Sequence, residues 1–119
     1  MGNPVGWFEI VGKDGKRLRN FYAGVFGWNI AGADGAMDYG LVEAAAKGIG
    51  GGIGSSPDGG AGHVTVYVDV DDIDAYLEKI EKAGGSTVMP ATEIAEYHMA
   101  FALFTDPEGH LVGLTKNGV

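Results

Sequence analysis

Residues 8–28 read FEIVGKDGKRLRNFYAGVFGW, a short apolar strand that passes through a turn into an amphipathic helix ending at glycine. Residues 66–85 read VYVDVDDIDAYLEKIEKAGG and follow the same plan. A shift of 58 positions places Phe8 on Val66 and Gly27 on Gly85. A repeat of this length in a chain of 119 residues predicts two copies of one supersecondary unit.

Each half completes the pattern of one strand, one helix and three further strands. Asp14 is the predicted N-cap of the first helix and Gly27 its end, whereas Asp71 or Asp72 caps the second helix and Gly84 ends it. We therefore predict an α+β fold of two βαβββ modules in tandem. The strands are predicted at residues 5–11, 28–31, 36–43, 48–53, 63–69, 86–93, 99–105 and 111–116.

Length and composition predict a single domain over residues 1–119. Module one covers residues 1–54 and module two residues 63–119, and a linker rich in Ser, Pro, Asp and Gly covers 55–62. The absence of cysteine excludes disulfides, thiolate metal sites and a thiol nucleophile. A net charge of −8 argues against nucleic acid as a partner, because its phosphates would repel the chain.

No apolar stretch approaches the ~18 residues of a membrane span, and the first residues lack the basic and apolar regions of a signal peptide. We therefore expect a cytoplasmic protein with no membrane partner. Half of the eight basic residues gather at the first helix, where they form either an anion site or a solvated helix face. These residues are Lys13, Lys16, Arg17 and Arg19.

Two motifs suggest ligand loops but lack the required residues. The glycine run at residues 48–54 has neither a GK[ST] ending nor a following helix, so it does not predict a phosphate loop. The acidic run at residues 69–74 lacks the glycine and the final glutamate of a calcium loop. The first run is better explained as a strand that another group approaches closely, and the second as a helix N-terminus.

Three segments carry a family resemblance: FYAGVFGW at residues 21–28, GHVTVYVDVDD at 62–72 and FTDPEGHLVGL at 104–114. In this order they resemble the vicinal oxygen chelate superfamily, which includes glyoxalases, bleomycin resistance proteins and extradiol dioxygenases. The resemblance implies a curled sheet around a cleft that binds a small molecule, and a homodimer. Because lyases, epimerases, dioxygenases and binding proteins share this fold, it does not select one activity.

Metal-dependent members of that superfamily hold a divalent ion with one ligand from the first and one from the last strand of each module. His63 matches the ligand of module two, but the repeat places Val5 at the equivalent position of module one. The last-strand positions fall on Gly113 and among Gly50–Gly52. Since an open catalytic site keeps about three protein ligands, we expect no cofactor, and His63 ligates only if a metal is bound.

Alternation along the first strand places Glu9 on the same face as Trp7. Glu9 is the candidate general base, with His63 and Tyr67 as polar catalytic partners. The alternative is structural: Glu9 tied to backbone amides or to Arg19, and His63 a hydrogen-bonded core histidine. The candidate substrate-binding residues are Trp7, Val5, Thr65, Gly51, His98 and Gly113.

Two functions remain open. One is a glyoxalase-like lyase or isomerase that acts on a small carbonyl compound without the usual four-ligand metal site. The other is a metal-free sequestering protein of the bleomycin-resistance type, which would bind a cationic or aromatic compound and use the acidic charge to attract it.

Overall fold

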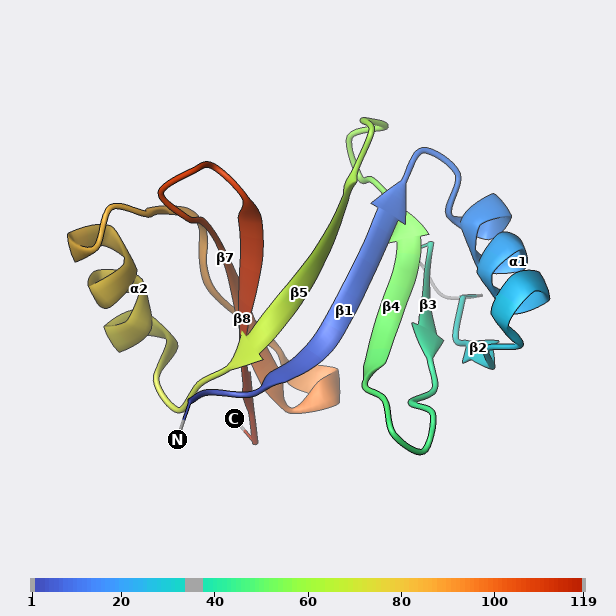
Figure 1. The fold of residues 1–119 in the computed structure, drawn as a ribbon, viewed down its shortest axis with the longest axis horizontal. Coiled ribbons are helices and arrows are strands. Elements are labelled where there is room, and N and C mark those ends of the chain that lie inside the picture. The colour runs from blue at the N-terminus through green and yellow to red at the C-terminus, as the bar shows by residue number, and fades with distance from the viewer. Residues whose placement is uncertain (1, 34–37, 119) are drawn as a thin grey trace. The chain divides into compact units, whose positions relative to one another are not determined.

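The structure is a computed structural model that describes residues 2–33 and 38–118. Its elements follow the predicted order, with strand, helix and three strands in each half (Figure 1). The α+β class and the two βαβββ modules are therefore confirmed. The first half contains β1 (Val5–Gly12), α1 (Gly15–Phe26), β2 (Ile30–Ala31), β3 (Tyr39–Val42) and β4 (Gly50–Ser55). The second contains β5 (His63–Asp69), α2 (Ile73–Lys82), β6 (Ser86–Ile94), the 3₁₀ turn η1 (Ala95–Tyr97), β7 (Met99–Thr105) and β8 (Leu111–Asn117).

Helix ends follow the predicted capping chemistry. The Asp14 side chain accepts a hydrogen bond from the backbone N–H of Arg17, at 3.0 Å. Gly27 ends α1 with φ of 72°, a left-handed conformation that favours glycine because it has no Cβ. At α2 the structure selects Asp72 over Asp71, since Asp72 accepts from the backbone N–H of Ala75, at 3.1 Å.

Strand bounds differ from prediction mainly in the first half. The strand expected at residues 28–31 is reduced to β2, because the ring of Trp28 stacks on Tyr22 of α1 with centroids 5.5 Å apart. The strand expected at 36–43 is observed as β3, and residues 36 and 37 lie outside the described part of the chain. The strand expected at 48–53 is displaced to Gly50–Ser55, because a turn closed by Gly48 N–H and the Ala45 carbonyl precedes it.

Contacts divide the chain into two compact units, residues 7–65 and residues 1–6 with 66–119. The strand order in the first unit is β2-β3-β4-β1, with β1 parallel to β4 and the other pairs antiparallel. Helix α1 provides the crossover that the parallel pair requires. The core of this unit lies between helix and strands and contains Ile10, Val42 and Ile53, with Phe8, Leu18, Tyr22, Trp28 and Ile30 packed against them.

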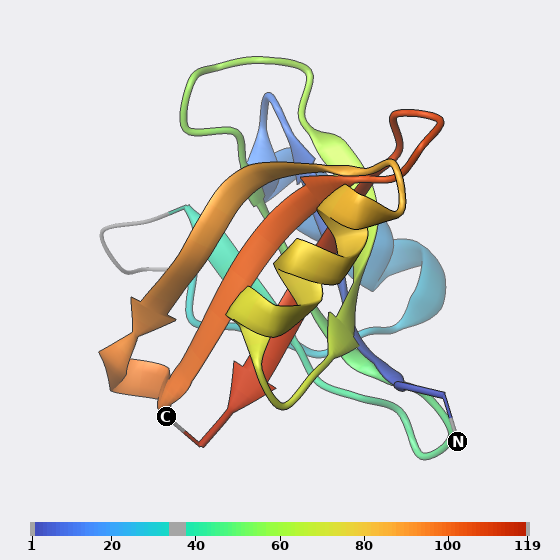
Figure 2. The same ribbon diagram turned by 90° about the vertical axis from the view of Figure 1, so that its left-hand side faces the viewer.

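The second unit, which includes β5 from residue 66 onward, has the order β5-β8-β7-β6, with β5 parallel to β8 and the other pairs antiparallel. Figure 2 shows α2 lying across the strands of this unit. Its core is formed by Val70, Ile73, Leu77, Ala100, Ala102 and Leu114. Among the described residues, no helix is long and apolar enough to cross a membrane.

Candidate functional site

The side chains on the two faces of β1 differ in polarity. Phe8 and Ile10 face α1 and belong to the core of the first unit. Trp7 and Glu9 point to the opposite face, as alternation along the strand predicts. The Glu9 side chain is only 14% exposed, so this carboxylate depends on protein partners in place of most of its water.

Both carboxylate oxygens of Glu9 have such partners. Oε1 lies 2.7 Å from Nε2 of His63, and Oε2 accepts a hydrogen bond from the Tyr39 hydroxyl, also at 2.7 Å. The indole Nε1 of Trp7 donates to the same hydroxyl oxygen at 3.3 Å. All four residues belong to the first unit. Together they form one hydrogen-bonded array, which we call the Glu9 array: Trp7, Tyr39, Glu9 and His63.

The glycines of β4 leave room for the aromatic members of the Glu9 array. Gly52 is the register partner of Glu9, and a Cβ at this position would overlap the phenol of Tyr39. A Cβ at Gly50 would lie 3.2 Å from a ring carbon of Trp7. The glycine run therefore allows two rings to lie directly on the strand, which is the close approach that glycine in a strand indicates.

Sequence reasoning selected Glu9, Trp7 and His63, and the structure brings these three together. It missed Tyr39, which lies 30 residues from Glu9. Tyrosine is common in strands, so its presence in a predicted strand does not mark Tyr39 as a site residue. Only the pairing of β3 with β4 places this ring over Gly52.

Arg19, the alternative partner considered for Glu9, binds elsewhere in the first unit. Its guanidinium lies 2.6 Å from Oδ1 of Asp38 and donates to the carbonyl of Ile53 at 3.1 Å. Asp38 also accepts a hydrogen bond from the hydroxyl of Ser55. The Ser55 hydroxyl, and next the Arg19 guanidinium, hold the pKa of Asp38 below its usual range. This group joins α1 to β4 and to Asp38, the residue before β3.

The remaining predicted site residues lie in several environments. Thr65 and Tyr67 are buried, and Val64, next to Thr65, is 75% exposed, in agreement with the predicted face of β5. A Cβ at Gly113 would overlap the ring of Tyr67, and a Cβ at Gly51 would overlap the ring of Phe8. Gly51 therefore faces the core side of its unit.

Two further predicted residues are exposed. Val5 is 44% exposed at the start of β1. His98 follows the 3₁₀ turn η1 with φ of 52°, and its side chain is also exposed. The roles proposed for these residues in ligand binding stay predictions.

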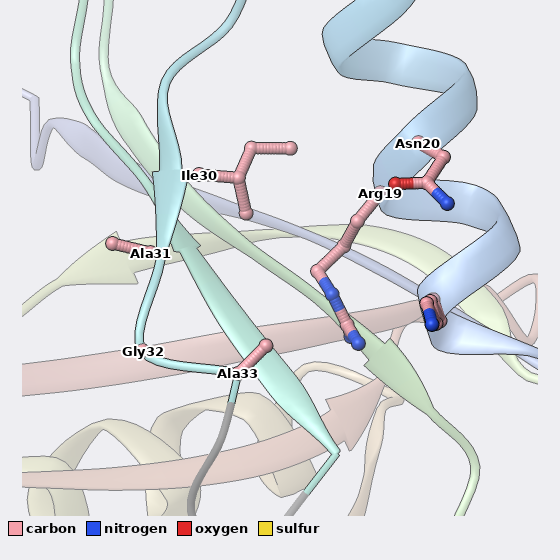
Figure 3. A pocket seen from close by; sticks show the side chains of 7 residues that line it. Arg19, Asn20, Ile30, Ala31, Gly32 and Ala33 are labelled. Carbon is pink, nitrogen blue, oxygen red and sulfur yellow. The ribbon is translucent and has the colours of Figure 1, made fainter.

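The basic residues of α1 line two cavities in the first unit. One, of about 550 Å³, lies between α1 and β2, and the side chains of Arg19 and Ile30 extend into the space between these elements (Figure 3). The other, of about 450 Å³, lies beside α1 and includes Lys13, Arg17 and Phe21. The residues found to line these two cavities include no member of the Glu9 array.

The donor set of the Glu9 array does not match a divalent metal site. Within residues 2–33 and 38–118, no group of three or more His, Asp or Glu side chains is placed to hold an ion. Glu9 and His63 bind each other at hydrogen-bonding distance, whereas two ligands of one tetrahedral zinc lie roughly 3.3 Å apart. The arrangement is that of a carboxylate held by an imidazole and a phenol.

The family model described as "Glyoxalase/Bleomycin resistance protein/Dioxygenase superfamily" matches residues 5–114. "Putative glyoxylase CFP32" of Mycobacterium tuberculosis is 31% identical over 96% of this chain and 45% of its own length. "Anthracycline biosynthesis protein DnrV" of Streptomyces peucetius is 28% identical over 99% of this chain and 48% of its own length. The chain thus spans less than half the length of these two relatives.

Solved structures give the same fold. Methylmalonyl-CoA epimerase from Mycobacterium tuberculosis superposes with a TM-score of 0.71 at 13% identity, covering 97% of this chain and 88% of that one. A superfamily member from Vibrio splendidus superposes with a TM-score of 0.67 at 14% identity, covering 98% of this chain and all of that one. At these identities the likeness shows the fold alone.

Proposed function

Because the chain belongs to the glyoxalase/bleomycin resistance protein/dioxygenase superfamily, we propose that it is an acid–base enzyme, a lyase or isomerase acting on a small carbonyl compound. The observation that carries this proposal is the Glu9 array. A carboxylate with a 14% exposed side chain, held at both oxygens, is fixed in direction as a general base must be.

The proposed role of Glu9 follows from the direction in which Tyr39 and His63 hold its carboxylate. In the proposed step Glu9 takes a proton from the carbon next to the substrate carbonyl, and the electron pair moves onto the carbonyl oxygen as an enolate. Return of a proton to the opposite face of the same carbon gives the epimer. Where that carbon carries a hydroxyl whose proton moves to the enolate oxygen, return of the proton to the former carbonyl carbon gives the isomer. His63 and Tyr39 keep the carboxylate of Glu9 oriented in both cases.

Deuterium exchange tests this step without knowledge of the physiological substrate. We would incubate the protein in D₂O with dihydroxyacetone or a methylmalonyl thioester and follow loss of the α-proton signal by NMR. Exchange should fall by about 10²–10⁴-fold in Glu9→Gln, the usual effect of removing a general base. Glu96→Gln, at an exposed position, is the matched control. Tyr67→Phe tests the predicted catalytic role of Tyr67, the residue that the repeat equates with Glu9.

Two results would contradict the enzyme proposal. One is exchange at the normal rate by a folded Glu9→Gln protein. The other is the absence of catalysed exchange with every carbonyl probe, at concentrations where the wild-type protein binds the probe.

We also propose a second candidate, a binding protein for a cationic aromatic compound. The indole of Trp7 beside the carboxylate of Glu9 favours it, because an aromatic face next to a negative charge suits a flat cation. DnrV, named for anthracycline biosynthesis, is a relative over nearly the whole chain. Calorimetry with an anthracycline tests this: binding that weakens in Trp7→Ala supports it, and no binding to the wild-type protein contradicts it.

A homodimer, a cytoplasmic location and the absence of a cofactor remain parts of the proposal that come from the sequence. Analytical ultracentrifugation at micromolar concentration measures the oligomeric state directly. A purely monomeric protein over that range would contradict the dimer.

A further inference from the structure

Tyrosine rings occupy two equivalent places in the two modules. Glu9 pairs in register with Gly52 on β4, and Tyr67 pairs in register with Gly113 on β8. Since the repeat equates Glu9 with Tyr67, Gly52 and Gly113 are equivalent too. A Cβ at Gly52 would overlap Tyr39, and a Cβ at Gly113 would overlap Tyr67. Neither position can carry a side chain while its tyrosine stays in place.

These glycine positions are the last-strand positions at which the family resemblance implies metal ligands. At Gly52 the three atoms nearest to a built Cβ all belong to the Tyr39 phenol. The phenol therefore fills the space that a carboxylate at position 52 would need. Its hydroxyl is used for a hydrogen bond to Oε2 of Glu9, while His63 takes Oε1.

We propose that Tyr39 has replaced the metal-ligand side chain of module one, and that this exchange makes the Glu9–His63 pair a metal-independent site. Tyr39 is a positioning residue that supplies a hydrogen-bond donor to one oxygen of Glu9. Gly52 is required for the exchange, because only glycine leaves room for the ring on β4. The inference concerns the site of the proposed function but does not depend on catalysis, and metal binding tests it separately from turnover.

Introducing a carboxylate at position 52 tests the proposal most directly. In Tyr39→Ala/Gly52→Glu the ring is removed, and the introduced carboxylate lies opposite Glu9 in the β1–β4 register. With Glu9 and His63 it completes three protein ligands, the number that an open catalytic site keeps. We would titrate the wild-type and variant proteins with Co²⁺ alone and record the visible absorption that protein ligands induce, with metal content measured after desalting.

We expect no stoichiometric Co²⁺ in the wild-type protein and one ion per chain in Tyr39→Ala/Gly52→Glu. The gain in affinity should exceed the ~10–100-fold by which residues supporting metal ligands change metal binding. Tyr39→Ala/Gly52→Gln is the matched control, since the amide has similar size but is a poor ligand. Adding His63→Gln to the double variant should abolish the gain.

Circular dichroism and thermal unfolding establish that each variant is folded, and Tyr39→Ala/Gly52→Asp provides a second variant with a shorter carboxylate. One bound Co²⁺ per wild-type chain that is lost in Glu9→Gln would overturn the proposal. So would failure of both folded carboxylate variants to bind Co²⁺. Neither result depends on the deuterium-exchange assay, so a failure of the proposed function is distinguishable from a failure of this inference.

Discussion

The imidazole Nε2 of His63 lies 2.7 Å from Oε1 of Glu9, across 54 residues of sequence. The two side chains are 25% and 14% exposed, so water replaces the lost partner only in part when one of them is removed. His63→Ala should therefore lower the free energy of unfolding by about 1–3 kcal/mol, the cost of leaving a largely buried polar group without its partner.

Urea denaturation at pH 7 measures this difference. His110→Ala is the control, because its side chain is 72% exposed in the turn before β8 and its pair with Asp106 is at the surface. It should change stability by less than about 0.5 kcal/mol. Equal effects of the two substitutions would contradict a stabilising role for the His63–Glu9 contact.

Gly52→Ala tests how closely the Tyr39 ring packs against β4. The added methyl group overlaps the phenol, so the ring must move and its hydrogen bond to Glu9 is lost. Overpacking of this kind typically costs about 1–3 kcal/mol. In a Tyr39→Ala background the same substitution should cost much less, because the obstructing ring is absent. A double-mutant cycle by chemical denaturation measures the coupling, and a coupling energy near zero would contradict the observed packing.

Gly24→Ala should increase the stability of the protein, whereas Gly52→Ala should decrease it. Gly24 lies inside α1. Among the described residues, apart from its chain neighbours and the nearby backbone of the same helix, no atom lies within 4 Å of the Cβ that alanine would add. Alanine is favoured over glycine in a helix by about 1 kcal/mol, so the variant should unfold at a higher temperature. Differential scanning calorimetry measures the shift. A lower melting temperature would contradict this prediction.

The contact between Asp38 and its partners predicts a pH dependence. Ser55 and then Arg19 lower the pKa of Asp38 from its usual value of 3.8. A lowered pKa in the folded state adds stability that is fully present above pH 3.8 and is lost as the pH falls through the folded-state value. Asp38→Asn should thus be less stable than the wild-type protein at pH 6, by no more than about 1 kcal/mol because the Asp38 side chain is 45% exposed.

Thermal melts of both proteins between about pH 6 and pH 2 test this prediction. The difference in melting temperature should shrink as the pH falls below 3.8, because protonation removes from the wild-type protein the charge that the Asp38→Asn variant lacks at every pH. A difference that stays constant over the whole range would show that the charge of Asp38 does not stabilise the fold.

Much of the fold could be predicted from local patterns. The bounds of β5 and β7 match the predicted residues, because each has apolar residues in a regular run between turn residues. The N-cap Asp14 and the left-handed Gly27 were predicted from the chemistry of helix ends. Strand β2 was predicted less well, since ring packing of Trp28 overrides the strand preference of its short segment.

The sequence by itself determined the duplicated βαβββ plan and the faces on which Glu9 and His63 lie, because helix and strand periodicity are local properties of the chain. Only the tertiary structure decided what holds Glu9. Its partners Tyr39 and His63 are 30 and 54 residues away, and their positions follow from strand register. The pairing of β3 with β4 lays the Tyr39 ring over Gly52, and no local pattern encodes that contact.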